Sequence, residues 1–263
     1  MKNLFFGCAA AVILSGCCGI CDKPSDIADG NYNDPITVCK TDKAVKIDGK
    51  LDDAIWQTAP KHEMVYLDNS SLSPEKEAKR MRESIHNEGY VQMAYDDKYV
   101  YIAASLEDQD VLSYVEQDQE YHFRNADTLE MFFWPTEGLQ YWEFYATPNN
   151  YKTSYWYLSG GLLSLNKTFE YPLNKEMKVA STVQGTLNKQ DDSDTGWITE
   201  VAIPLTEFTK HGVKFEPGQS WKVQIARYNH SANIYKMQLS SYPKLPIQGG
   251  FHNREYYAPV IFK

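Results

Sequence analysis

Two neighbouring stretches of the sequence each set a glutamate among large aromatic rings. They are ADTLEMFFWP, residues 126–135, and LQYWEFYATP, residues 139–148. Read with the two-residue period of a β-strand, each stretch has one plainly apolar face. The opposite faces combine carboxylates with rings: Thr128, Glu130, Phe132 and Trp134 in the first stretch, and Tyr141, Glu143 and Tyr145 in the second.

The two stretches predict a hairpin in which residues 135–140 form the connection. The register that follows is a set of cross-strand pairs: Trp134 with Tyr141, Phe132 with Glu143, and Glu130 with Tyr145. The two glutamates are then diagonal neighbours, about 7–8 Å apart at the backbone. The next stretch, YKTSYWY at 151–157, adds tyrosines to the same face. We therefore expect a sheet face paved with rings that hold carboxylates between them.

Rings and carboxylates together suit a saccharide. The axial C–H groups of a sugar lie against an aromatic ring, and its hydroxyls donate strong hydrogen bonds to a carboxylate. A concave wall of this kind is a plausible ligand surface. On this interpretation, Glu130 should point into an open, wettable hollow. The alternative from the same residues is an ion pair, in which Glu130 or Glu143 binds Arg227 of WKVQIAR.

Two carboxylates at this separation would also suit an inverting glycosidase, which needs roughly 6.5–9.5 Å between them. The chain has no nucleophile elbow, no His-x-x-x-His pair and no Gly-rich phosphate loop. The six histidines are scattered, and only His252, in FHNRE, is a candidate ligand contact. No residue is assigned a catalytic role.

The charge of the chain restricts which partners other than a saccharide are expected. The net charge is −9, and no basic run could follow a phosphate backbone, so nucleic acid is not an expected partner. Four acidic residues supply the hard oxygen ligands that calcium prefers, although no spaced loop motif joins them: Asp108, Asp110, Asp127 and Glu130. A bound structural calcium ion is therefore kept as an alternative.

The first 17 residues resemble a bacterial lipoprotein signal peptide. A lysine precedes an apolar run too short to span a bilayer, and the run ends in Leu14-Ser15-Gly16-Cys17. Cleavage at this lipobox-like sequence would leave lipid on Cys17 and hold the protein in the bacterial envelope, at the outer membrane. Cys39 could form a disulfide with Cys18 or Cys21 in that oxidising compartment.

Residues 18–35 are polar and turn-rich and predict a flexible tether, which leaves 36–263 as one domain. Short strand patterns at regular spacing fill that domain, with single helical turns at KLDDAIWQTAP and PLTEF. PEKEAKRMRES, at 74–84, is expected to be a charged loop segment with helical character. AVKIDG, at 44–49, is expected to be a strand that runs into a turn. The pattern predicts an all-β fold, a two-sheet antiparallel β-sandwich of jelly-roll type.

Six blocks of this domain, in order from Val45 to Phe262, resemble family 9 carbohydrate-binding modules, most of all their stand-alone lipoprotein versions. They are VKIDGKLDDAIWQTA, YDDKYVYIAASLED, ADTLEMFFWPTEGLQYWEFYATPNN, GTLNKQDDSDTGWITEVAIPLTEF, SWKVQIARYNH and FHNREYYAPVIF. The resemblance implies a β-sandwich that binds sugar without cleaving it, in the breakdown of glycans.

The resemblance also implies which residues contact the sugar. The acid that hydrogen-bonds it corresponds to Glu130, and a second acidic position corresponds to Asp108. The two tryptophans that sandwich the sugar in the family correspond to Phe123 or Arg124 and to Phe251, so this chain lacks that pair. The available replacement rings are Phe123, Phe251, Trp134 and Tyr145.

The sequence thus predicts a lipid-anchored, non-catalytic domain that binds an oligo- or polysaccharide. The two other hypotheses are a hydrolase of O-glycosyl compounds and a structural subunit of a surface complex that degrades or takes up glycans.

Overall fold

The computed structural model describes residues 34–158, 169–170, 177–232, 236–246 and 250–263. These residues belong to one compact unit, Asn31–Lys263. The expected signal segment, its Cys17, and the cysteines at 18 and 21 lie outside the described residues. Cys39 is a free thiol among the described residues. No helix in the described ranges has the length and apolar character needed to cross a membrane.

The described chain is mostly β-structure, as the sequence predicts. The strands are β1 Ile36–Lys40, β2 His62–Glu63, β3 Val65–Tyr66, β4 Gly89–Tyr95, β5 Tyr99–Glu107, β6 Thr128–Pro135, β7 Tyr141–Ala146, β8 Lys152–Tyr157, β9 Phe169–Glu170, β10 Lys178–Gln184, β11 Gly196–Pro204, β12 Trp221–Asn229, β13 Gln238–Tyr242 and β14 Ala258–Phe262. The helices are α1 Glu75–Arg82 and α2 Thr206–Thr209, with 3₁₀ turns η1 Ala54–Gln57, η2 Ser70–Leu72, η3 His122–Arg124 and η5 Arg254–Tyr256.

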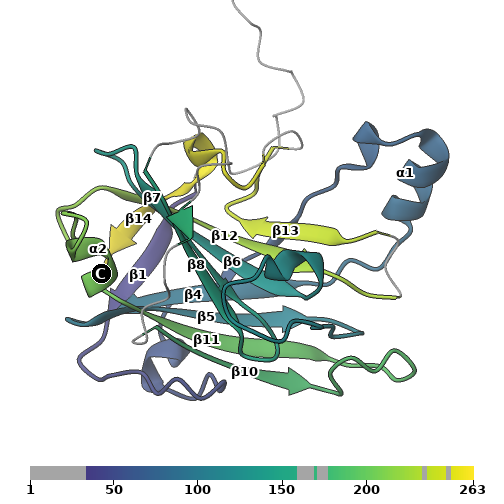
Figure 1. Ribbon diagram of the computed structural model, residues 1–263, viewed down its shortest axis with the longest axis horizontal. Helices are drawn as coiled ribbons and strands as arrows, with labels where there is room; N and C mark the ends of the chain where they lie inside the picture. Colours follow the sequence, from purple (N-terminus) through teal and green to yellow (C-terminus); the bar gives the residue numbers. More distant parts are fainter. Residues whose placement is uncertain (1–33, 159–168, 171–176, 233–235, 247–249) are drawn as a thin grey trace, which may run out of the picture. The chain divides into compact units, whose positions relative to one another are not determined.

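Eleven strands form one hydrogen-bonded path, in the order β10-β11-β5-β4-β1-β14-β12-β6-β7-β8-β9. Off this path, β2 pairs with β4, and β13 pairs with β12 and β3. Figure 1 shows β10, β11, β5 and β4 side by side. Most neighbours are antiparallel, as expected. The departure is β1, which pairs in parallel with both β14 and β4 and so joins the two halves of the path. Because strands far apart in the sequence make these pairs, strand alternation alone does not predict them.

One predicted strand, at residues 44–49, does not form. AVKIDG is not a strand, because its last residues wrap around a buried carboxylate instead of pairing with a neighbour. Glu200 accepts the backbone N–H groups of Asp48 and Gly49 at 3.1 and 2.9 Å, and the indole N–H of Trp56 at 2.8 Å. Gly49 has φ +78°, in the left-handed region that glycine adopts at low cost. The first strand is β1.

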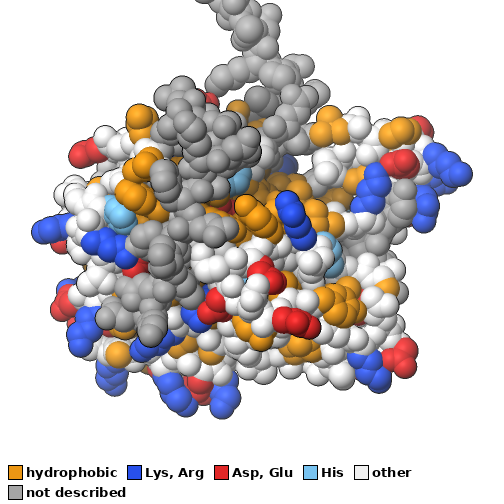
Figure 2. All heavy atoms as spheres, viewed as in Figure 1, with side chains coloured by type: hydrophobic (Ala, Val, Ile, Leu, Met, Phe, Trp, Pro, Cys, Tyr) orange, Lys and Arg blue, Asp and Glu red, His pale blue; other side chains and the backbone are white. Residues whose placement is uncertain are grey.

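The main core lies on the apolar face that the alternation predicts. Leu129, Met131 and Phe133 of β6 are fully buried in it, together with Trp142 and Phe144 of β7. The other face of the same strands packs into a second, aromatic cluster. Figure 2 shows hydrophobic side chains exposed among charged ones on the face in view.

Candidate functional site

The hairpin of β6 and β7 has the predicted register. Glu130 pairs with Tyr145, and Phe132 pairs with Glu143. On β8, Tyr155 lies opposite Glu143. Directly paired residues share a face, so both carboxylates and the tyrosines around them lie on the side away from the main core. This surface of β12, β6, β7 and β8 is called the aromatic face below.

The two carboxylates of the aromatic face have different surroundings. The hydroxyl of Tyr145 donates to Glu143 Oε1 at 2.8 Å, and the hydroxyl of Tyr157 donates to Glu143 Oε2. Glu143 is therefore held by two tyrosine donors. Burial raises the pKa of Glu130 well above its ordinary value, the charge of Glu143 raises it further, and a hydrogen bond with Tyr145 opposes the shift.

The expectation that Glu130 lines an open hollow is wrong for this conformation. Glu130 is 2% exposed and Glu143 is 1% exposed. Rings cover them, because Phe132, Tyr145 and Tyr155 pack into one cluster with the rings of later segments. A ligand can therefore touch the rim of the aromatic face directly, but it reaches either carboxylate only if a ring moves.

The positions that correspond to the family's tryptophans, Phe123 and Phe251, lie on either side of a ring that the sequence analysis missed. Tyr228 of β12 stacks on Phe123 with centroids 5.1 Å apart, and its ring meets Phe251 edge-on at 5.3 Å. Burial, with the charges of Glu130 and then Glu143, raises the pKa of Tyr228. The alternation of β12 could have identified this ring in the sequence. Tyr228 lies two residues beyond Ala226, the partner of Glu130, and therefore on the same face of the sheet.

The other end of the aromatic face carries Trp134 and His252. Trp134 is half-buried, its indole donates to the carbonyl of Gly138 at 2.8 Å, and the guanidinium of Arg254 lies 4.4 Å from its ring. His252 is exposed and its Nδ1 lies 3.0 Å from the hydroxyl of Tyr141. This end therefore offers an aromatic surface with polar and cationic edges.

Two predicted site residues, Asp108 and Arg227, do not lie at the aromatic face. Arg227 pairs in register with Leu129, so it faces the main core and not Glu130. Its Nη2 donates to Asp108 Oδ2 at 2.8 Å, and the side chains are 1% and 0% exposed. The predicted alternative of an ion pair between Arg227 and Glu130 or Glu143 is therefore wrong. A ligand contact by Asp108 stays a prediction of the family resemblance.

A third acid completes this buried cluster. Burial, opposed by Arg227, raises the pKa of Asp108 to about 6. Burial and the charge of Asp108 raise the pKa of Asp127 well above its ordinary value. Asp127 also accepts the backbone N–H groups of Leu112 and His230. The cluster holds the ends of β5, β6 and β12 together.

The cluster does not form a cation site. Among the described residues, no three His, Cys, Asp or Glu side chains are arranged to hold a metal ion. Of the four acids considered for calcium, Glu130 lies on the opposite face of the sheet, and Arg227 already neutralises Asp108.

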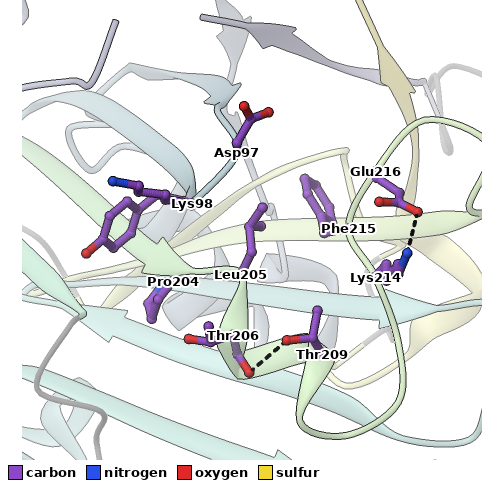
Figure 3. A pocket seen from close by; sticks show the side chains of 10 residues that line it. Asp97, Lys98, Pro204, Leu205, Thr206, Thr209, Lys214, Phe215 and Glu216 are labelled. Carbon is purple, nitrogen blue, oxygen red and sulfur yellow. Dashed lines mark hydrogen bonds and ion pairs between the residues drawn. The ribbon is translucent and has the colours of Figure 1, made fainter. Parts of the chain in front are cut away.

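The described residues also line a cavity that includes none of the predicted site residues. This cavity of about 490 Å³ lies between the β4–β5 turn and the segment after β11, and Figure 3 shows Leu205, Phe215 and the Lys214–Glu216 ion pair in its lining. It has one tyrosine, Tyr99, and no paired carboxylates. Its lining indicates no particular ligand.

The comparisons with known proteins decide the family. The model of the family described as carbohydrate family 9 binding domain-like matches residues 47–242, which is more than half of the chain. The chain belongs to this family. Comparison with curated proteins gave no match.

Solved structures agree with the family 9-like fold. A candidate carbohydrate-binding protein from Bacteroides uniformis has a TM-score of 0.65 at 14% identity, covering 88% of this chain and 99% of that one. A family 9 carbohydrate-binding module from Caldicellulosiruptor kristjanssonii, in complex with cellotriose, has a TM-score of 0.56 at 13% identity, covering 87% and 93%. A structure of such a module from the same organism with glucose has a TM-score of 0.52 at 13% identity, covering 86% and 95%.

The family 9-like domain therefore brings most of the predicted site residues together. Those at the aromatic face are Phe123, Arg124, Glu130, Trp134, Glu143, Tyr145, Phe251 and His252. Asp108 and Arg227 form the separate buried cluster.

Proposed function

We propose that this family 9-like domain binds a saccharide at the aromatic face without cleaving it. One observation carries the proposal: the face combines stacked rings with two carboxylates, on strands whose other side forms the main core. Half-buried rings at its rim, Phe123, Tyr228 and Trp134, offer the apolar surface that a pyranose requires.

Glu130 is proposed as the charged acceptor for a sugar hydroxyl. Its cross-strand partner Tyr145 meets Phe123 edge-on, and Phe123 stacks on Tyr228. The carboxylate is proposed to become accessible when this ring pair shifts. A hydrogen bond to a charged group contributes about 1.5–3 kcal/mol. The oxygens of Glu143 are already engaged by tyrosine hydroxyls, and this residue is proposed to orient the rings.

The test is a calorimetric titration with glucose, cellotriose and a wider glycan array, because related modules are seen with the first two sugars. We expect Glu130→Gln to lower the affinity by about 1.5–3 kcal/mol. Glu137→Gln, in the β6–β7 turn, is the matched control and should bind as the wild type does. A wild-type protein that binds no saccharide at millimolar concentration would overturn the proposal.

A glycoside hydrolase is the rival activity. The raised pKa of Glu130 beside Glu143 is a feature that acid–base pairs share. However, hydrolysis needs a water between the carboxylates, and both are almost fully buried here. Release of product from a polysaccharide panel, lost in both Glu130→Gln and Glu143→Gln, would favour the hydrolase.

We further propose that lipid on Cys17 anchors the domain in the bacterial envelope, at the outer membrane, where it takes part in glycan breakdown with degrading or uptake proteins. The lipobox-like ending of the first 17 residues supports this. Mass spectrometry of the N-terminal peptide should detect acylated Cys17, and Cys17→Ser should release the protein from the membrane fraction. An unmodified, membrane-free wild type would contradict the proposal.

A further inference from the structure

One exposed tyrosine at the rim of the aromatic face, Tyr121, has no role in the saccharide site proposed above. Tyr121 precedes the turn η3 and is 46% exposed. We infer that Tyr121 is a stacking platform for a second sugar unit, so that the domain prefers oligosaccharides to monosaccharides. This inference rests on the proposed function, and it assigns a role in ligand length to a residue outside the predicted set.

Ring contacts fix the orientation of Tyr121. Its ring lies nearly parallel to that of Tyr155, with centroids 6.0 Å apart and planes at 21°. It meets Phe123 edge-on at 6.1 Å. Tyr155 lies opposite Glu143 in the sheet. Tyr121 therefore extends the aromatic face outward from the carboxylates to solvent, in the direction that a longer ligand could follow.

The segment that carries Tyr121 is pinned to the edge of β8. Gln119 exchanges hydrogen bonds with the backbone of Ser154, donating at 3.1 Å and accepting at 2.7 Å. The hydroxyl of Thr153 donates to the carbonyl of Glu120 at 2.9 Å. Lys152 forms an ion pair with Asp118 at 2.9 Å.

On the other side of Tyr121, His122 is fully buried, with its Nε2 3.0 Å from the carbonyl of Gln117. The residues before and after Tyr121 are thus held by the protein, while its own ring packs on Tyr155 and stays partly exposed to solvent. A ring that is already ordered loses little conformational entropy when a ligand stacks on it.

Arg124 adds polar character to the platform. It is exposed, and its guanidinium lies 4.8 Å from the ring of Tyr121 and 5.8 Å from that of Phe123. Its five N–H donors could reach sugar hydroxyls next to either ring. An exposed ring with donors at its edge recognises the same chemistry as the aromatic face, one sugar unit farther out.

The chain offers a matched control in the same connection between β5 and β6. Tyr114 is 55% exposed, comparable to Tyr121, and its backbone N–H is bonded to the carbonyl of Asn125. Loss of its ring removes a similar exposed surface without touching the aromatic face.

The test compares the affinity for cellotriose with that for glucose by calorimetry in the wild type, Tyr121→Ala, Tyr121→Phe and Tyr114→Ala. We expect Tyr121→Ala to lower the cellotriose-to-glucose affinity ratio roughly two- to tenfold, the usual range for one aromatic contact. Tyr121→Phe and Tyr114→Ala should keep the wild-type ratio.

Each other outcome overturns the inference in a distinguishable way. An unchanged ratio in Tyr121→Ala, with sugar still bound, overturns the platform alone. An equal loss for both sugars shows that Tyr121 supports only the first site. A wild type that binds neither sugar overturns both this inference and the function on which it rests.

Discussion

At the scale of single residues, Arg227 was predicted as a ligand contact, and the structure shows that it forms a buried ion pair. Its guanidinium is the cation that lies between the buried acids and the backbone, with Nη2 2.8 Å from both Asp108 Oδ2 and the carbonyl of Glu107. Without it, two carboxyl groups would be buried with no cation to pair with them. Arg227 therefore contributes to stability by pairing with a buried carboxylate, and a ligand contact by Arg227 stays a prediction.

We predict that Arg227→Met lowers the free energy of unfolding by about 3–5 kcal/mol, the usual effect of removing one partner of a buried ion pair. Urea denaturation near neutral pH measures this. Lys189→Met is the control, because Lys189 is exposed and pairs with Asp191 and Asp192 near the surface, so the change should alter stability by no more than about 1 kcal/mol. Equal effects of the two variants would show that the buried pair is not needed.

At the scale of elements, β7 and β8 are joined by more than their backbone ladder. The ring of Tyr157 stacks on that of Tyr141 with centroids 4.4 Å apart and planes at 6°. Its hydroxyl donates to the buried Glu143 of the neighbouring strand. Each strand thus supplies part of the support for a carboxylate that is almost fully buried.

We predict that Tyr157→Phe lowers the free energy of unfolding by about 1.5–3 kcal/mol, because it removes a hydrogen bond to a buried charged group. Tyr151→Phe is the control just before β8, since the structure records no hydrogen bond of its hydroxyl in the described part of the chain. Chemical denaturation of the two variants measures the difference in their free energies of unfolding. If they are equally stable, the Tyr157 hydroxyl is not what holds Glu143.

The elements also show what alternation can and cannot predict. The register of β6 and β7 followed from the sequence because a two-residue period and a short connection leave few choices. Residues 44–49 failed to form a strand because Glu200, more than 150 residues later, binds their backbone. β13 and the two-residue strands β2 and β3 carry too little pattern to be recognised in the sequence.

At the scale of the whole molecule, the sequence located the aromatic face but not what covers it. The alternation of β6 places Glu130 on the same side as Phe132, which is correct, yet it cannot say that rings from distant segments close over the carboxylate. Tyr121 was missed because its position beside the aromatic face depends on a loop docked onto β8, and such docking leaves no periodic signal.

The covered carboxylate makes folding depend on pH. The folded-state pKa of Glu130 lies above its ordinary value, so the folded protein holds a proton that the unfolded chain releases. Its contribution to stability is full below about pH 4.3, the ordinary pKa of glutamate, and falls as the pH rises toward the folded pKa. Glu130→Gln carries no such proton, so its unfolding free energy should fall less between pH 5 and about pH 8.

Ligand affinity should change with pH in the opposite direction. If a sugar hydroxyl donates to ionised Glu130, binding favours the deprotonated form, and the wild-type affinity should rise as the pH increases from about 5, with Glu130→Gln showing no such rise. Calorimetry with cellotriose across that range measures it, and Glu137→Gln should follow the wild type. Both pH dependences, of the unfolding free energy and of the affinity, arise from protonation of Glu130. If the stability of the wild type falls with pH while its affinity does not change, Glu130 titrates with folding but does not contact the ligand.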